Sequence, residues 1–154
     1  MNELQTSLFN AGLKVFEDLG FMLPTSELDP EQAAAAFHSA VSVHFRGPVR
    51  GTLLVAISGN ILPTLASNML GEEESPSDWQ QKDALKELAN VICGNLLPQI
   101  AGPRAVFDLG EPQIRTSEDV PNGDLPLTAR QSIGLENGRA ELLLYLSEGS
   151  CLQE

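Results

Sequence analysis

The sequence WQQKDALKELANVICGNLLPQI, residues 79–100, predicts a long amphipathic helix around which the rest of the chain is arranged. Its apolar residues recur at helical spacing, and a step of about 100° per residue places four of them on one side of the helix. These four are Leu85, Leu88, Ile92 and Leu96. A face of this kind has to be buried against a second layer of structure. The helix is therefore expected to lie on a sheet or on another helix.

A short row of polar residues lies behind the apolar stripe. Asp83, Glu87 and Asn90 follow the spacing i, i+4 and i+7, so they fall within an arc of roughly 60°, and Gly94 continues the row one turn later. A solvated outer face is the ordinary explanation of such a row. Gly, however, is about 1 kcal/mol less favourable than Ala in a helix. Its presence is understandable where another molecule approaches the backbone closely.

The residues around this row resemble a known signature. The segment DALKELANVICGN, residues 83–95, contains D-x-x-x-E-x-x-N and continues as A-N-x-I-x-G-N. This pattern resembles the signature helix of the CheC/CheX/FliY chemotaxis phosphatase family, in its CheX-like form. The segment RGTLLVAISGNILPTLASNMLG, residues 50–71, is also similar to the strand and helix that precede the signature helix in that family. The resemblance extends over residues 4–147.

Length, composition and charge limit the class of protein. The 154 residues, 42% of them apolar, fit a single folded domain over 1–154 with an ordered core of about 4–147. The formal charge of −12 argues against binding to nucleic acid or to an anionic membrane surface. We find neither a signal peptide nor an apolar run of about 18 residues. We therefore expect a cytoplasmic protein.

Cysteine and histidine give little support to metal or thiol chemistry. Cys93 and Cys151 do not form a disulfide pattern, and two separate thiols suggest a reducing compartment. His38 and His44 share the polar face of one predicted strand, but a metal site would need further ligands. We expect no metal and no cofactor on this chain.

Periodicity and turn residues predict the remaining elements. A helix over 4–19 is followed by a possible strand at 21–23 and a loop over 25–32, whereas 33–36 fit either helix or strand. Two hairpins are predicted, one from strands 37–45 and 51–58, and one from strands 127–135 and 139–147 around Glu136-Asn137-Gly138. A helix over 60–70, a short strand within 105–114, and exposed loops at 72–77 and 117–124 complete the chain, before a frayed tail at 148–154.

Two details of the predicted strands matter below. Phe37, Val41, Val43 and Phe45 are expected on one face of the first strand, with Ser39 as a polar exception. The second strands of the two hairpins are also alike, since RGTLLVAIS at 50–58 is echoed by RAELLLYLS at 139–147. This echo suggests an internal duplication, with chance similarity of two apolar strands as the alternative.

The resemblance implies a fold and an assembly. Members of the family have an α+β, CheC-like fold, in which a mixed sheet carries two long, pseudo-symmetric helices. Some members have the signature on both helices. Here Ser7 of the first helix is followed four residues later by Ala11 instead of Glu, so one site per chain is implied. CheX-like proteins form homodimers through their sheets, and a homodimer is expected on the same grounds.

The resemblance also implies an activity. The substrate would be a CheY-like response regulator phosphorylated on an aspartate, and the Mg²⁺ of the reaction would be bound by that receiver domain. Asn90 would orient the attacking water and Glu87 would pair with the receiver's lysine, so both are predicted catalytic residues. Asp83 would add a polar contact at the rim. From the helical wheel we infer that Gly94 gives clearance for the partner, which makes Asp83, Glu87 and Gly94 the predicted partner-binding residues.

Two other functions remain open from the sequence. The chain is alternatively a non-catalytic CheX-like adaptor that binds a receiver domain or a flagellar-switch protein. The same row of residues would also serve as a contact between two copies of the chain. The intact D-x-x-x-E-x-x-N pattern favours the phosphatase, because an adaptor has no need of Asn90.

Overall fold

The computed structural model describes residues 2–25, 27–58, 61–71, 76–115, 127–136 and 138–146. Four helices and seven strands lie in these ranges. In chain order they are α1 (Glu3–Asp18), β1 (Pro24–Thr25), α2 (Pro30–Ala34), β2 (Phe37–Arg46), β3 (Gly51–Ser58), α3 (Leu62–Leu70), α4 (Asp78–Ala101), β4 (Asp108–Leu109), β5 (Gln113–Arg115), β6 (Leu127–Leu135) and β7 (Gly138–Leu146).

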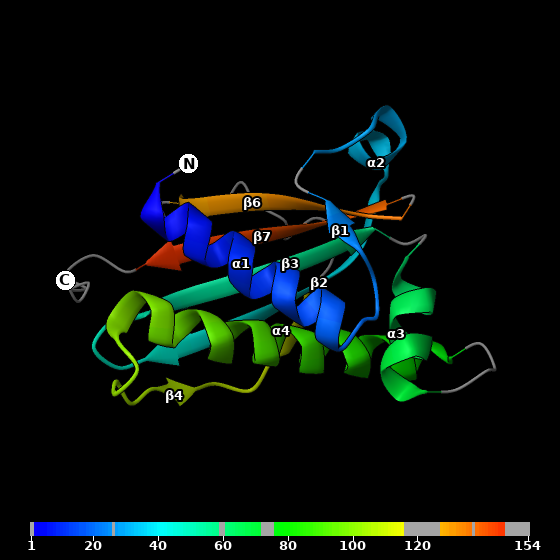
Figure 1. Ribbon diagram of the computed structural model, residues 1–154. Coiled ribbons are helices and arrows are strands. Elements are labelled where there is room, and N and C mark those ends of the chain that lie inside the picture. The colour runs from blue at the N-terminus through cyan, green and yellow to red at the C-terminus, as the bar shows by residue number, and fades with distance from the viewer. Residues whose placement is uncertain are drawn as a thin grey trace.

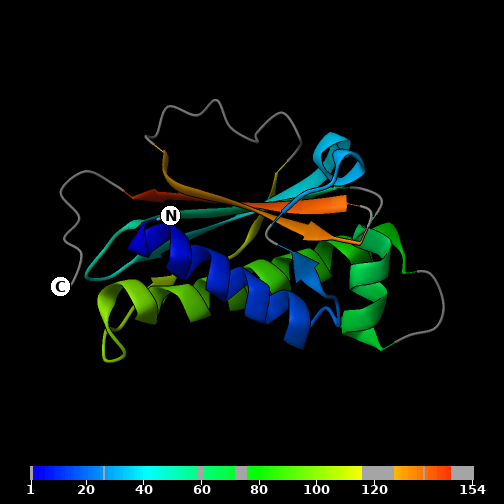
Figure 2. The same cartoon turned by 45° about the horizontal axis from the view of Figure 1, so that its top comes forward.

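One sheet carries two long helices on a single face. The strands follow the order β1-β6-β7-β3-β2-β4, and β5 also pairs with β2. α1 and α4 lie side by side and run in opposite directions (Figure 1). Figure 2 shows them as one layer against the sheet. The predicted α+β class, with two long helices on one sheet, is confirmed.

The sheet is antiparallel at every described pairing, so the expectation of a mixed sheet was wrong. Tight turns join β2 to β3 and β6 to β7, and a tight turn can connect only antiparallel neighbours. The two hairpins then meet through β3 and β7, which also run in opposite directions. Both predicted hairpins are confirmed.

The two halves of the sheet are related by an approximate twofold axis. β3 and β7 contain the two echoed segments and lie side by side at the centre of the sheet. Leu54 and Leu143 occupy the same place in the two segments, and they pair directly with each other. Equivalent residues pair in this way only close to a twofold axis, so the structure favours duplication over chance similarity.

The predicted apolar stripe of α4 forms the centre of the core. Leu85, Leu88, Ile92 and Leu96 have no exposed surface. They pack with α1 and with the helix-facing side chains of the sheet in one cluster. Because this face is fully buried, the opposite face of α4 has to point away from the sheet.

A bulge changes the predicted faces of β2. The register between β2 and β3 shifts between Phe37 and Ser39. A bulge adds a residue to one strand and reverses the side on which the following side chains lie. Phe37 therefore packs on the outer face of the sheet with Ala40 and Tyr145, and does not share a face with Val41, as the sequence had suggested.

The start of the short helix α2 was wrongly predicted, because residues 25–32 were assigned to a loop, while 33–36 were left open as helix or strand. Asp29 and Gln32 form a capping box with Pro30 in the first turn, and these three residues carry a recognisable helix-start signal. The side chain of Arg139 in β7 then donates hydrogen bonds to carbonyl oxygens at the end of α2. Its guanidinium also lies over the ring of Phe37, 4.3 Å from the centroid.

Glu141 is a buried acidic residue on the outer face of the sheet. The residue is 4% exposed, and its carboxylate accepts hydrogen bonds from Arg130, Arg139 and the hydroxyl of Ser132. A buried carboxylate is tolerated when it is paired and hydrogen-bonded in this way. Arg139 therefore links the buried carboxylate to α2.

Other boundaries differ slightly from the prediction. The strand expected at 21–23 is absent there, and β1 is formed by the next two residues, Pro24–Thr25. The single strand expected within 105–114 is replaced by two short strands, β4 and β5. α3 ends at Gly71, whose φ of 68° is readily adopted by glycine. Asn60, Asn137 and the predicted loops at 72–75 and 117–124 lie outside the described residues, as does the predicted tail at 148–154.

Gly12 brings α1 close to the sheet. A β-carbon at this position would lie 2.5 Å from Cδ1 of Leu142 and 2.7 Å from Cδ1 of Ile133. Both leucine and isoleucine side chains are fully buried, so they have little room to move. At Gly94 in α4, by contrast, a β-carbon would meet nothing within 4 Å.

The two mid-helix glycines allow a matched test of this packing. Gly12→Ala and Gly94→Ala gain the same intrinsic helix propensity, about 1 kcal/mol. We expect Gly94→Ala to raise the free energy of unfolding by about that amount. Overpacking against the sheet should make Gly12→Ala about 1–3 kcal/mol less stable than Gly94→Ala. Urea denaturation followed by circular dichroism measures both, and equal stabilities would contradict the close approach of α1.

Candidate functional site

The start of α4 is held by a capping box. The hydroxyl of Ser77 accepts a hydrogen bond from the backbone N–H of Gln80, and the side chain of Gln80 accepts one from the N–H of Ser77. Lys82 and Asp78 form an ion pair of 2.9 Å in the first turn. These contacts satisfy the exposed N–H groups of the helix start and define where each following side chain points.

The four predicted site residues lie together on the outer face of α4. Asp83, Glu87 and Gly94 are exposed, and Asn90 is half-buried. With a rise of 1.5 Å per residue, Glu87 lies about 6 Å from Asp83 along the axis and Asn90 about 4.5 Å further on. We call these four residues the α4 row. The sequence predicted which residues belong to this row, and the structure shows that it faces away from the sheet.

Asn90 combines a rigid backbone with an accessible side chain. Its neighbour Ala89 is fully buried, and Val91 packs against the edge of the same core. The amide of Asn90 is only partly covered. A carboxamide donates hydrogen bonds through its NH₂ and accepts them through its oxygen. Asn90 is thus able to contact two groups of a docked molecule at once, from a position that the core keeps constant.

Gly94 presents bare backbone at the end of the row. The open space around its α-carbon leaves the backbone accessible. Pro98, four residues later, has no N–H and cannot donate the usual helical hydrogen bond to the carbonyl of Gly94. The helix nevertheless continues to Ala101, and the N–H of Gly102 donates to the carbonyl of Pro98 at 3.0 Å.

Cys93 lies beside the row in sequence but faces the core. Its thiol is fully buried, and burial raises the pKa of Cys93 to about 12. The thiolate is the nucleophilic form of cysteine, and this pKa keeps the group protonated at neutral pH. Cys93 is therefore a core residue.

The histidine and acidic side chains do not gather into a metal site in the described part of the chain. No group of three or more His, Cys, Asp or Glu side chains there is arranged to hold an ion. His44 is exposed, and its Nδ1 lies 2.7 Å from Oγ1 of Thr52. The side chain of His38 lies outside the described residues.

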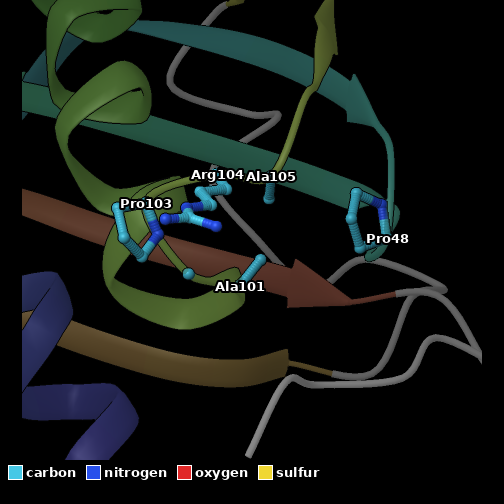
Figure 3. Close-up of a pocket in the computed structure, with 6 residues that line it drawn as sticks. Pro48, Ala101, Pro103, Arg104 and Ala105 are labelled. Carbon is cyan, nitrogen blue, oxygen red and sulfur yellow. The ribbon is translucent and has the colours of Figure 1, made fainter.

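A cavity of about 410 Å³ lies at the far end of α4 (Figure 3). It is lined by Pro48, from the turn between β2 and β3, and by residues 101–105. Ala101 follows Asn90 by eleven residues, about 16 Å along the helix axis. This cavity is therefore separate from the α4 row, which lies on the convex surface of a helix. A convex row suits contact with another macromolecule better than the enclosure of a small substrate.

Trp79 belongs to the same face of α4 and was not singled out from the sequence. It precedes Asp83 by four residues, which places it one turn earlier along the row. Its side chain is 72% exposed. The spacing that identified Asp83, Glu87 and Asn90 also includes Trp79. The helical spacing alone is thus a sufficient signal for Trp79, provided that apolar residues on the outer face are counted with the polar ones.

Comparison with known proteins identifies the family. The family model for the chemotaxis phosphatase CheX matches residues 39–124, more than half of the chain and including the whole α4 row. The chain therefore belongs to the CheX family of chemotaxis phosphatases. A search of curated proteins finds no match.

Solved structures share the fold at low sequence identity. The chemotaxis protein CheX from Desulfovibrio desulfuricans is 15% identical, with a TM-score of 0.74 and coverage of 95% of this chain and 100% of that chain. CheX from Vibrio vulnificus is 14% identical, with a TM-score of 0.74 and coverage of 95% and 97%. The CheX–CheY–BeF₃–Mg²⁺ complex from Borrelia burgdorferi contains a chain 19% identical to this one, with a TM-score of 0.66 and coverage of 93% and 97%.

Within the described residues, no helix has both the length and the apolar composition needed to cross a bilayer.

Proposed function

We propose that this protein accelerates hydrolysis of the aspartyl phosphate of a CheY-like response regulator. The observation that carries the proposal is the α4 row, in which two carboxylates and a carboxamide point outward from a helix whose other face is fully buried. Membership in the CheX family gives the reaction class, and a related CheX chain has been crystallised in complex with CheY.

Phosphoryl transfer asks a catalyst mainly for positioning and for placement of charge. In the proposed reaction a water oxygen attacks the phosphorus in line with the aspartyl oxygen, and the bond from phosphorus to that oxygen breaks. The products are a free aspartate and dihydrogen phosphate, which keeps the oxygen and both protons of the water and can then release one proton to solvent. A Mg²⁺ ion bound by the receiver would neutralise the phosphoryl oxygens. This chain contributes positioning and charge, so it needs no nucleophile of its own.

Asn90 has the chemistry for this placement. Its side-chain oxygen accepts a hydrogen bond from the water, and its NH₂ donates one to a phosphoryl oxygen. Glu87, one turn earlier, provides the charge that pairs with a lysine beside the phosphoaspartate. Asp83 adds a polar contact at the rim. We also propose a cytoplasmic homodimer, in line with the family.

Recognition has to work against overall charge. The chain carries a formal charge of −12, and the phosphorylated site of a receiver is itself acidic. Long-range electrostatics therefore do not favour the encounter. Affinity must come from the local pairing of Glu87 and from contacts that exclude water.

Asn90→Ala tests the catalytic assignment. We expect it to reduce the accelerated decay of a phosphorylated receiver by at least about 10²-fold, because the water is no longer held in line. The half-exposed position predicts little change in stability. The assay follows loss of the phosphoryl label from purified receivers. Unchanged decay would reject the role of Asn90.

The helix offers a matched control in Asn95→Ala. Asn95 lies on the same helix outside the row, and its side chain donates to the carbonyl of Val91. This variant removes the same amide and should retain activity. Binding of the receiver without faster decay in the unmodified protein would instead support the adaptor function.

Glu87→Lys tests the ion pair with the receiver. The reversed charge should weaken binding of the phosphorylated receiver by roughly 10-fold or more, since like charges now face each other. Replacing the receiver's lysine by glutamate should restore part of this loss, whereas Asp83→Lys should not be restored in the same way. Isothermal titration calorimetry with the stable beryllofluoride form of the receiver measures the affinity of each combination of protein variant and receiver variant. Equal affinities for all combinations would show that Glu87 does not face the lysine.

Gly94→Ala separates stability from partner contact. The methyl group points into open space in the free protein and should raise the free energy of unfolding by about 1 kcal/mol. If a receiver loop approaches the bare backbone, the same methyl group should raise KM for the phosphorylated receiver several-fold. Thermal melting and the decay assay on one preparation test both effects. A stabilised variant with unchanged KM would show that the receiver does not approach the backbone at Gly94.

A further inference from the structure

Within the described ranges, Trp79 is not part of the core, and no contact there explains its position. It lies in the first turn of α4, on the outer face, with 72% of its surface exposed. Large aromatic side chains are normally buried, and one that is left in water marks a contact site more often than a polar residue does. The buried stripe of α4 already covers the sheet without it.

The geometry points to Trp79 as an apolar anchor for the same receiver domain that the α4 row contacts. This inference rests on the proposed function and extends its surface. Trp79 lies one turn before Asp83 and two turns before Glu87, about 12 Å from the latter along the axis. If the lysine of the receiver meets Glu87, a second part of the receiver surface, about 12 Å from that lysine, would cover Trp79. That patch has to be apolar or aliphatic to gain from the indole.

The backbone at Trp79 lies in a capped first turn. Trp79 stands between Asp78, which pairs with Lys82, and Gln80, which belongs to the capping box. A tryptophan side chain has only two torsion angles, so it loses little conformational freedom when a partner covers it. Tryptophan is also enriched among the residues that contribute most to binding at protein interfaces.

The same end of the helical layer carries further exposed apolar residues. The end of α1, α3 and the start of α4 lie together there (Figure 1), and the side chain of Asn68 in α3 donates a hydrogen bond of 2.8 Å to the carbonyl of Gly20. Phe21 and Leu23, which follow Gly20, are 72% and 86% exposed. The apolar surface at this end therefore extends beyond one indole.

Kinetics of Trp79→Ala test the anchor. We expect KM for the phosphorylated receiver to rise roughly 10-fold, the size typical of a lost aromatic contact, with kcat within about twofold. KM changes without kcat because Trp79 lies far from Asn90 and contributes only to binding. Val106→Ser is the matched control, since Val106 is 82% exposed but lies beyond the other end of α4. An unchanged KM in Trp79→Ala, or an equal rise in Val106→Ser, would overturn the inference.

A second measurement needs no substitution. Trp79 is the single tryptophan of the chain, so its fluorescence reports directly on this site. Adding the beryllofluoride form of a receiver that lacks tryptophan should shift its emission to shorter wavelength and protect it from acrylamide quenching. Unchanged emission at saturating receiver would overturn the inference.

The outcomes also separate this inference from the proposed function. Protection of Trp79 by a receiver whose decay is not accelerated would support the docking surface and reject the phosphatase. Faster decay of the phosphorylated receiver, with Trp79 still quenched by acrylamide, would support the phosphatase and reject Trp79 as an anchor. If Trp79→Ala changes the oligomeric state in light scattering and leaves receiver binding intact, the indole belongs to a contact between two copies and the inference fails.

Discussion

Burial of the apolar stripe of α4 against the sheet is the contact on which the rest of the structure depends. Leu85, Leu88, Ile92 and Leu96 are removed from water, and burial of side chains of this size contributes about 1.5–3 kcal/mol each. Because the helix cannot rotate without exposing them, the opposite face is held outward over its whole length. The functional row is therefore a direct consequence of core packing.

The approximate twofold symmetry explains why one chain has two long helices and only one row. The hairpins meet at Leu54 and Leu143, and each half places a helix on the same face of the sheet. To repeat the signature from Ser7, α1 would need a glutamate at position 11, but that residue is Ala11, which is buried and faces the core, whereas Glu87 of α4 is exposed. One half of the duplication then supports the sheet while the other carries the exposed carboxylate and amide. The buried Ala11 could not be replaced by glutamate without placing a charge in the core.

A site built on a convex helix limits what chemistry it performs. It cannot surround a small substrate, and the cavity beside Pro48 lies at the other end of α4. The row instead brings one amide and one charge to the surface of another protein, which would supply the metal and the reacting carboxylate. Rate enhancement by positioning alone requires a rigid support. α4 provides one through its capped start and its buried stripe.

The sequence by itself determined the helix of α4, the members of its polar row and the two hairpins, because all of these depend on local periodicity and turn residues. Only the tertiary structure decided that the sheet is antiparallel, that a bulge turns Phe37 to the outer face, and that Arg139 holds a short helix at Pro30–Ala34. It also decided that Gly12 is pressed against the sheet while Gly94 is open. These features depend on which distant segments come into contact, and the spacing of residues along the sequence does not reveal those contacts.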